Sequence, residues 1–267
     1  MFTFFAALAV AALPVMAQSV SVVETDGTTT DFNTSTIESL NVSETSLLPE
    51  GHTSSTVTLR ASWASLGTSI TWYNNNVSSS NGRFTKGYQD RVMQKLHFQK
   101  FTNLGLNGKC LIDSYNGTLV KADYYTIEHG INDWGHSTKV GTIDDYINDT
   151  GTGTFAGTYR KLIDKIYKTN AKAKIILCTP RKAYGFSGYL PDHWYDAYNG
   201  IYLQDYADLI KQIAAYESLP VADFFYLCGN QHNLASLSID TALHPNDDGY
   251  QMMANVLLQA FQSVMIH

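Results

Sequence analysis

The chain has 267 residues, 44% of them hydrophobic, and a formal net charge of -6 at pH 7. This length and apolar content are enough for one sizeable α/β domain. An acidic balance without a basic cluster argues against nucleic-acid binding, which needs a positively charged surface to neutralise phosphates.

An uncharged apolar run opens the sequence. Phe4 to Val15 carries no charged side chain, and Ala17 closes a Val-Met-Ala triplet that suits signal peptidase. We therefore predict a signal peptide over residues 1–17 and a secreted protein; an apolar N-terminal strand is the alternative. The run is too short for a comfortable membrane span, and no later segment is long and apolar enough to form one.

Residues 18–58 differ in composition from the rest of the chain. Nearly half of them are Ser or Thr, and no Lys or Arg occurs before Arg60. Six acidic residues in this stretch account for the whole net negative charge of the chain. Such a segment cannot bury enough apolar surface to offset its own ordering entropy. We predict an acidic arm that is mobile, O-glycosylated or laid on the main domain as a strand-like extension.

Five Asn-x-Ser/Thr sequons favour a secreted glycoprotein in a host that glycosylates, and they begin at Asn33, Asn41, Asn76, Asn116 and Asn148. The cysteines are an odd set without a Cys-x-x-Cys pair, which argues against a thiolate metal site. They are Cys110, Cys178 and Cys228. Burial as small hydrophobic residues is the simplest interpretation, and one disulfide with a leftover thiol is the alternative.

From residue 59 onward, short apolar runs alternate with segments of helical period. We predict strands over residues 61–66, 100–106, 123–128, 174–178 and 221–227. Apolar residues recur every three or four positions, as on one face of a helix, over residues 85–98, 155–168, 203–217 and 249–264. Strands separated by such helices predict a parallel sheet covered on both faces. Ligands bind beyond the carboxyl ends of the strands of such a sheet, so we expect the chemistry in the loops that follow them.

Candidate catalytic residues lie in two such loops. Ser69 follows the first predicted strand, where a hydroxyl would stand near backbone N–H groups. His244 precedes Pro245 in an extended segment that also carries Asp240. A His beside a carboxylate is what a general base needs, because the acid fixes the imidazole tautomer and stabilises its protonated form. Taken separately, ordinary turn and capping roles explain each segment equally well.

Two further loops offer hydrogen-bond donors for a developing oxyanion. Gly108 lies in Leu-Asn-Gly-Lys after the second predicted strand, and Asn132 lies in Gly-Ile-Asn-Asp after the third. A glycine lets a backbone N–H approach a ligand closely, and an asparagine amide is a neutral donor. Each of the two loops also has a turn explanation when considered alone.

The four segments together, in this order, resemble the motifs of the SGNH/GDSL hydrolases over about residues 60–264. The resemblance implies an α/β fold, a three-layer α/β/α sandwich with a five-stranded parallel sheet of flavodoxin-like type. It assigns residues 59–267 to the hydrolase domain. It also implies a secreted serine esterase that cleaves carboxylic esters through an acyl-enzyme, without a metal or an organic cofactor.

The same resemblance implies the role of each candidate residue. Ser69 matches the family's nucleophile and His244 its base, with Asp240 as the third member of the triad. The oxyanion hole is formed by the Ser69 and Gly108 N–H groups and the Asn132 amide.

The sequence departs from the family pattern at two positions. Thr68 replaces the Asp of the usual Gly-Asp-Ser block, which should adjust the turn rather than abolish the reaction. Asp240 and His244 are separated by three residues, where the family usually has two. A turn can absorb the extra residue, since positions i and i+4 share a face on a helical turn. Otherwise a backbone carbonyl orients His244 and the site is a Ser-His dyad.

Aromatic residues are dense between positions 183 and 203 and adjoin the motifs. Aromatic faces pack well against sugar rings, although rings that cover the core under a long loop give the same pattern. We predict as substrate-binding residues Trp72, Trp134, Tyr184 and Trp194. An acetylated carbohydrate is the favoured ester. The alternatives are a lipase or lysophospholipase on the same scaffold, and a glycan-binding or adhesion module with weakened catalysis.

Three histidines outside the motifs show no compact metal-ligand spacing, so a surface or rim role is predicted for His129, His136 and His193.

Overall fold

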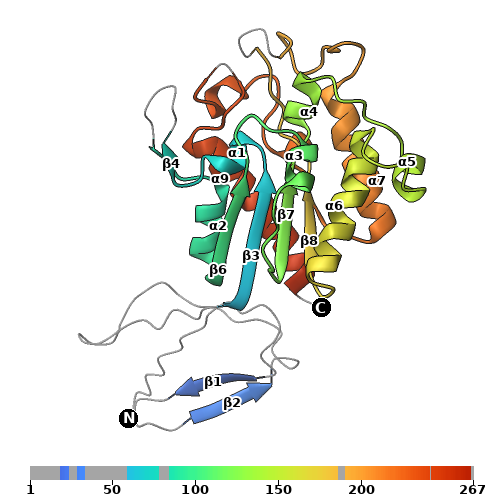
Figure 1. The fold of residues 1–267 in the computed structure, drawn as a ribbon. Coiled ribbons are helices and arrows are strands. Elements are labelled where there is room, and N and C mark those ends of the chain that lie inside the picture. Colours follow the sequence, from blue (N-terminus) through green and yellow to red (C-terminus); the bar gives the residue numbers. More distant parts are fainter. Residues whose placement is uncertain are drawn as a thin grey trace. The chain divides into compact units, whose positions relative to one another are not determined.

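The computed structural model describes residues 19–23, 29–33, 59–77, 84–185, 190–240 and 242–265. Backbone contacts divide the chain into two units, residues 1–57 with 265–267 and residues 58–264. In the first unit, strands β1 (Ser19–Val23) and β2 (Thr29–Asn33) pair in antiparallel register (Figure 1). The signal peptide predicted over 1–17 and most of the arm predicted over 18–58 lie outside the described residues.

The second unit is built on a parallel sheet of five strands in the order β6-β3-β7-β8-β9. The strands are β3 (Leu59–Gly67), β6 (Phe98–Gly105), β7 (Tyr124–Glu128), β8 (Lys174–Cys178) and β9 (Val221–Ala222). The first strand of this unit, β3, therefore lies inside the sheet. The next strand, β6, is added on one side of β3, and the strands β7, β8 and β9 follow on the other side. This is the flavodoxin-like order, so the predicted fold class is confirmed.

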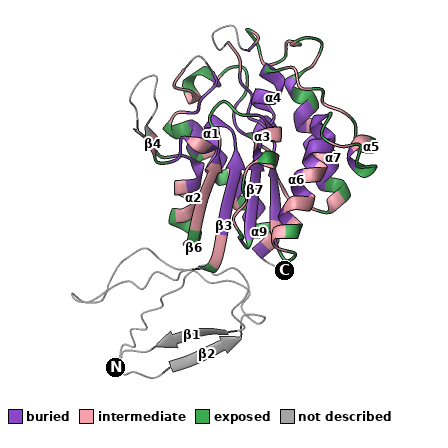
Figure 2. Cartoon of the chain, viewed as in Figure 1, coloured by how far each residue is buried: buried purple, intermediate pink, exposed green. Residues whose placement is uncertain are grey.

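Helices cover both faces of the sheet (Figure 1). The main core lies under α3 (Leu111–Asn116), α6 (Phe155–Thr169) and α7 (Leu203–Glu217). The other face packs against α2 (Tyr88–Leu96) and α9 (Asp247–Met265). Figure 2 shows β7 and the upper part of β3 as buried, whereas β6 at the edge of the sheet is mostly intermediate or exposed.

Side chains along β3 alternate between the two cores, as the pleat of a strand requires. Ala64 and Leu66 join the core under α6 and α7. Trp63 points to the other face, where its ring lies 5.6 Å from Phe98 and 5.2 Å from Phe261 of α9. Both faces of β3 are therefore buried, which fixes the register of the strand that ends at the candidate nucleophile.

The long helices lie close to the predicted ranges. α7 has the predicted bounds, and α6 extends one residue beyond the predicted range, to Thr169. α2 is shorter than the range 85–98, because His97 adopts a left-handed backbone with φ of 48° and Phe98 already belongs to β6. A residue in that conformation is a common helix ending.

The strand predicted over 221–227 is wrong beyond its first two residues. β9 contains only Val221 and Ala222, and Asp223 then caps the short helix α8 (Phe224–Leu227). The Asp223 carboxylate accepts a hydrogen bond from the Tyr226 N–H at 3.2 Å. A capping carboxylate at this position therefore overrides the β propensity of the aromatic residues that follow it.

The sequence pattern does not predict the short elements, because fewer than two helical turns show no period. They include α1 (Ser69–Trp72), α4 (Ile131–Gly135), α5 (Ile143–Ile147), the 3₁₀ turn η2 (Ala235–Leu237), and the paired strands β4 (Asn76–Val77) and β5 (Phe84–Thr85). Within the described ranges, no helix combines the length and the hydropathy that a bilayer span needs.

We predict that Gly105→Ala destabilises the fold. Gly105 ends β6 beside α1, and a Cβ there would lie 2.5 Å from the Trp72 nitrogen and 2.8 Å from the Thr71 carbonyl carbon. Backbone atoms cannot rotate away, so the free energy of unfolding measured in urea should fall by about 1–3 kcal/mol. Gly153→Ala is the control, since a Cβ at Gly153 meets no atom within 4 Å. Equal stability of the two variants would contradict this packing.

Candidate active site

Ser69 stands at the turn between β3 and α1. β3 ends at Gly67, Thr68 caps the helix by accepting a hydrogen bond from the Ile70 N–H at 3.3 Å, and Ser69 is the first helical residue. A Cβ on Gly67 would lie 2.8 Å from the Glu128 carbonyl oxygen, so only glycine allows the tight strand-to-helix turn. The Ser69 N–H and hydroxyl are therefore held at the carboxyl edge of the sheet.

Three predicted residues are joined by a continuous chain of hydrogen bonds. Ser69 Oγ lies 2.9 Å from His244 Nε2, and His244 Nδ1 lies 2.5 Å from Asp240 Oδ2. The His244 backbone N–H also donates to Asp240 Oδ1 at 2.8 Å. The carboxylate therefore holds both the ring and the backbone of His244. This arrangement suits the tautomer with the proton on Nδ1, which leaves Nε2 to accept the Ser69 proton.

A turn absorbs the extra residue between the acid and the base. The Leu243 N–H donates to the Asp240 carbonyl at 3.0 Å, and the Ile239 N–H donates to the His244 carbonyl at 2.9 Å. Residues Ser238 and Pro245 form an antiparallel bridge that closes this loop. The carboxylate consequently reaches His244 across one tight turn, although Thr241 itself lies outside the described residues.

The segment after His244 is anchored on both sides. Asn246 donates through its side-chain amide to the Ser236 carbonyl at 2.7 Å, and its Oδ1 accepts from the Gly249 N–H at 3.0 Å near the start of α9. Tyr250 of α9 donates from its hydroxyl to the Ile70 carbonyl in α1 at 2.9 Å. α9 is thus tied directly to the helix that begins with Ser69.

The predicted oxyanion donors lie at the same edge of the sheet. β3, β6 and β7 are neighbours and parallel, so the loops that carry Ser69, Gly108 and Asn132 leave the sheet side by side. Gly108 has a φ of +69°, and no atom lies within 4 Å of the Cβ that it lacks. Gly108 thus leaves open space at this position. A left-handed backbone in open space is one that glycine adopts at little cost.

Residues of α4 hold the loop that carries Gly108. Asn132 is buried, and its side-chain amide donates to the Lys109 carbonyl at 2.8 Å. Asp133 is also buried, and its carboxylate accepts from the Leu111 N–H at 3.2 Å. Burial raises the pKa of Asp133 to about 7. The two adjacent side chains thereby fix the geometry of residues 108–111.

Glu128 is a buried residue of the site that the sequence reasoning missed. Its Oε2 accepts from the Thr68 N–H at 3.2 Å, from Thr68 Oγ1 at 2.8 Å and from Thr71 Oγ1 at 3.1 Å. A carboxylate supplied from β7 therefore sits at the turn where Thr68 replaces the usual Asp. The sequence signal is a lone charged residue at the end of the apolar run 124–128.

The environment of Glu128 disfavours its charged form. Its side chain is fully buried, and within the described residues its Oε1 has no hydrogen-bond partner. Desolvation raises the pKa of Glu128 to about 7, against the hydrogen bonds from Thr68 and Thr71, which lower it. The carboxyl group is therefore largely protonated in mildly acidic solution.

One aromatic ring lies against the candidate base. Tyr73 is buried just after α1, and its ring is 5.0 Å from the His244 ring at an interplanar angle of 86°. An edge-to-face contact of this kind limits the rotation of the imidazole. The ring therefore helps to keep Nε2 directed at Ser69.

The predicted substrate-binding residues differ in their surroundings. Trp134 is fully buried in the main core and donates from Nε1 to the Ile201 carbonyl at 2.8 Å, so its placement at a binding surface is wrong. The other three are half-buried, and the Trp194 ring packs edge-on against Phe225; they are Trp72, Tyr184 and Trp194. The physical reason is that Trp134 belongs to the short helix α4, whose residues are all buried, so its indole packs in the core.

Three rings stack in the segment that follows β8, and two of them, His193 and Tyr195, are exposed. Tyr184 and His193 stack at 6.4 Å, and His193 and Tyr195 stack at 4.9 Å with an interplanar angle of 18°. Tyr195 is 43% exposed. Phe186 and Tyr189, from the same aromatic segment, lie outside the described residues. We call Tyr184, His193 and Tyr195 the ring stack.

The other histidines and the cysteines do not form a second reactive site in the described part of the chain. His136 and His193 are exposed, but the surface role predicted for His129 is wrong. His129 is fully buried against Ser114 Oγ at 2.8 Å, and burial lowers its pKa to about 3. No metal-binding group of His, Cys, Asp or Glu occurs among the described residues. The three cysteines are buried and free, as the simpler of the two interpretations predicts.

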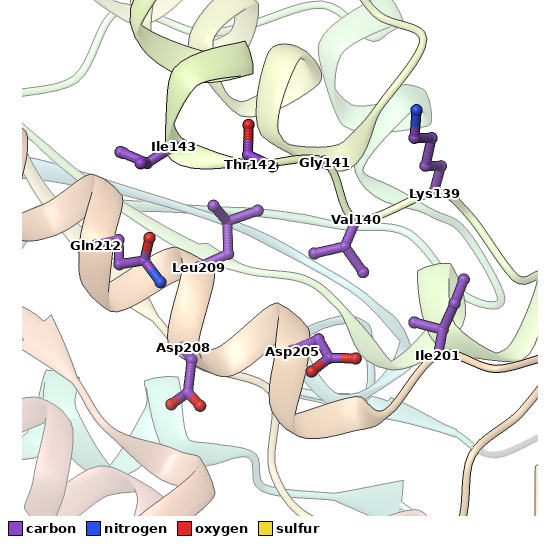
Figure 3. Close-up of a pocket in the computed structure, with 10 residues that line it drawn as sticks. All are labelled: Lys139, Val140, Gly141, Thr142, Ile143, Ile201, Asp205, Asp208, Leu209 and Gln212. Atoms are coloured by element: carbon purple, nitrogen blue, oxygen red, sulfur yellow. The ribbon is translucent and has the colours of Figure 1, made fainter.

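A cavity of about 620 Å³ lies elsewhere, between the loop before α5 and helix α7 (Figure 3). Its lining includes Val140, Ile201 and Leu209 with Asp205 and Asp208, but none of the three hydrogen-bonded residues Ser69, His244 and Asp240. The candidate active site is therefore located by its hydrogen bonds, and not by the size of a cavity.

The chain is similar to a known family of hydrolases and to solved structures. The model of the GDSL-like lipase/acylhydrolase family matches residues 65–252. A protein from Chitinophaga pinensis described as a possible lipase has a TM-score of 0.68 and 26% identity, and covers 78% of this chain and 100% of its own. Among curated proteins, none matches the chain.

Two more distant structures support the fold. A protein from Lactobacillus plantarum has a TM-score of 0.63 and 22% identity, and covers 78% of this chain and 99% of its own. A lipase/acylhydrolase from Enterococcus faecalis has a TM-score of 0.53 and 18% identity, and covers 77% and 97% of the two chains.

We predict that Glu128→Gln changes the pH dependence of stability. The folded-state pKa of Glu128 is raised from 4.5 to about 7, so the native state binds a proton that the unfolded state releases earlier. This contribution to stability is complete below pH ~4.5 and is lost as the pH rises through ~7, a change of about 3 kcal/mol. Glutamine keeps the shape and cannot ionise, so the variant should gain stability relative to the parent as the pH rises.

Urea denaturation of both proteins at pH 4.5, 6 and 8 measures this difference. Asp133 also has a raised pKa, but it is present in both proteins and cancels to first order. Parallel stability curves for the two proteins would show that Glu128 does not titrate in this range.

Proposed function

The chain belongs to the GDSL-like lipase/acylhydrolase family and is an ester hydrolase of that kind; we propose that it works as a serine esterase with Ser69 as nucleophile, His244 as general base and Asp240 as the acid that orients the base. The observation that carries this proposal is the chain of hydrogen bonds from Ser69 Oγ through both ring nitrogens of His244 to Asp240. The hydrogen bond from His244 to Asp240 favours a Ser-His-Asp triad over a Ser-His dyad.

The reaction proceeds in two steps. Ser69 Oγ attacks the ester carbonyl carbon while His244 Nε2 takes the hydroxyl proton, and Asp240 stabilises the imidazolium. The alcohol leaves with that proton when the tetrahedral intermediate collapses to the acyl-enzyme. His244 then activates water, which releases the acid and restores the Ser69 hydroxyl.

The negative charge of the tetrahedral intermediate falls on the former carbonyl oxygen. The Ser69 and Gly108 N–H groups and the Asn132 amide are the donors for it in this proposal, and one such donor is worth about 3 kcal/mol of barrier. The hydrogen bonds that Asn132 and Asp133 make to residues 109 and 111 support the proposal, because they hold the loop before the substrate arrives.

We further propose that the substrate is an acetylated carbohydrate. The ring stack follows β8, so it belongs to the carboxyl edge of the sheet where ligands bind in this architecture. Exposed aromatic faces pack against the C–H faces of sugar rings. A lipase or lysophospholipase role is the competing proposal, motivated by the descriptions of the similar Chitinophaga pinensis and Enterococcus faecalis proteins.

Secretion fits this substrate and is part of the proposal. The uncharged run Phe4 to Val15 and the Ala17 site support a signal peptide. Of the sequons, those at Asn116 and Asn148 lie on exposed asparagines, which a glycosylated protein requires.

We predict that Ser69→Ala abolishes hydrolysis of p-nitrophenyl acetate. The loss in kcat should be at least about 10⁴-fold, and Asp240→Asn should cost about 10²–10⁴-fold because the tautomer of His244 is no longer fixed. Ser263→Ala, which alters an exposed serine of α9, is the matched control. Activity of Ser69→Ala equal to that of the parent would eliminate the nucleophile, and an active Asp240→Asn would indicate a dyad.

We predict a preference for short acyl chains and for carbohydrate esters. The kcat/KM should fall from acetyl to octanoyl p-nitrophenyl esters, and acetylated xylan oligosaccharides should release acetate. Tyr195→Ala should raise KM for the oligosaccharides about fivefold while leaving p-nitrophenyl acetate unaffected, since a lost stacking contact is worth about 1 kcal/mol. Tyr216→Ala, at an exposed tyrosine of α7, is the control. Faster turnover of octanoyl esters would instead favour a lipase.

A further inference from the structure

Arg181 is a buried cation that the mechanism above does not use. It follows β8, two residues after Thr179, and its side chain is fully buried. Burial lowers the pKa of Arg181 to about 10, so the guanidinium is still protonated at neutral pH. No carboxylate among the described residues forms an ion pair with it. A charge buried in this way needs other polar partners.

Those partners all belong to the segment that carries the acid and the base. Nη2 donates to the Leu234 and Leu237 carbonyls, both at 3.3 Å, and to Ser238 Oγ at 3.1 Å. Nη1 makes a weaker contact with the Leu243 carbonyl at 3.5 Å. The acceptors thus lie on both sides of Asp240, and the last of them directly precedes His244.

The segment 234–243 needs such a clamp because it has little regular structure of its own. Among its described residues, the regular structure is the 3₁₀ turn η2 and the isolated bridge of Ser238 with Pro245. The Leu234 carbonyl accepts from the Leu237 N–H at 3.2 Å, and the Leu237 carbonyl accepts from the Asn246 N–H at 3.0 Å. Arg181 adds a donor to each of these two carbonyls, which fits the two lone pairs of a carbonyl oxygen. One guanidinium offers five N–H groups in a fixed plane, which lets it hold several carbonyls in one arrangement.

Arg181 itself is fixed by the sheet. The Thr179 N–H donates to the Ala222 carbonyl of β9 at 3.1 Å, and Thr179 Oγ1 donates to Asp223 Oδ1 at 3.1 Å and accepts from the Phe225 N–H at 2.9 Å. The clamp therefore connects a rigid strand end to an irregular loop. Ser69 is fixed by the same sheet through β3.

We propose that Arg181 is a positioning residue, whose guanidinium holds the turn of residues 234–243 so that Asp240 and His244 stay in line with Ser69. This inference rests on the proposed esterase function, in which that alignment matters for the rate. Misplacement of a catalytic group by about 1 Å can cost about 10²-fold in rate. Substrate binding does not depend on the turn in the same way, so the effect falls on kcat and not on KM.

Arg181→Met, Arg181→Lys and Lys182→Met test the proposal with p-nitrophenyl acetate. Lys182 is the matched control, since it is the next residue and is also buried, but its amine faces the rings of Trp194 and Phe225 at 4.8 Å. Arg181→Met should lower kcat about 100-fold with KM within threefold of the parent value. Lysine keeps the charge but offers fewer donors, so Arg181→Lys should recover about tenfold of that loss. Lys182→Met should keep kcat within twofold.

A spectroscopic measurement tests positioning without turnover. The Nδ1 proton of His244, in its short hydrogen bond to Asp240, should give a low-field proton resonance that is absent from Asp240→Asn. This resonance should persist in Lys182→Met and broaden or disappear in Arg181→Met and Arg181→Lys. Thermal melts of each variant establish that the protein is folded, and Arg181→Lys carries the test if Arg181→Met does not fold.

The two proposals fail in different ways. If the parent protein hydrolyses no ester but its low-field resonance depends on Arg181, the esterase function is wrong and the positioning role stands. If the parent is active and folded Arg181→Lys has the parent kcat and resonance, the positioning role is wrong. A loss of kcat in Lys182→Met as large as in Arg181→Met would also overturn the positioning role, because the loss would then not depend on the contacts that Arg181 makes with residues 234–243.

Discussion

The hydrogen bond between Ser69 Oγ and His244 Nε2 is the interaction on which the site depends, and it joins residues 175 positions apart in the chain. The position of each residue is fixed by the elements around it. Ser69 is set by β3, a strand buried on both faces between β6 and β7, and His244 is set by a turn and by the start of α9. Tyr250 connects the two parts directly through the Ile70 carbonyl. The fold thus converts a long sequence separation into one short contact.

Holding this contact requires polar groups in places where burial is costly. Glu128 supports the turn before Ser69, Asp133 supports the loop of Gly108, and Arg181 supports the turn of Asp240. All three are fully or almost fully buried. Burial raises the pKa of the two carboxyl groups and lowers the pKa of the guanidinium, which in each case favours the neutral form. Burying each of these groups carries a desolvation cost, and all three hold segments at the edge of the sheet where the chemistry is proposed.

Much of the fold follows from the pattern of apolar residues. α6 and α7 have enough turns to show a helical period, and four of the five predicted strands lie where expected, because long regular elements carry a repeated signal. The range 221–227 fails for a local reason, since the Asp223 carboxylate caps a helix after two strand residues. Trp134 fails for a tertiary reason, because its indole turns inward to reach the Ile201 carbonyl.

The candidate residues are recognisable from the sequence alone. Ser69, Gly108 and Asn132 lie in short motifs after predicted strands, and His244 lies in a His-Pro-Asn motif before a predicted helix. The sequence left open whether Asp240 reaches His244 across the extra residue. The three-dimensional structure answers this question, because the contact depends on a turn closed by hydrogen bonds from the Ile239 and Leu243 N–H groups. Glu128 and Arg181 likewise become visible only in three dimensions. The role of a buried charge is defined by its partners, and these partners are distant in sequence and are brought close only by the packing of the sheet.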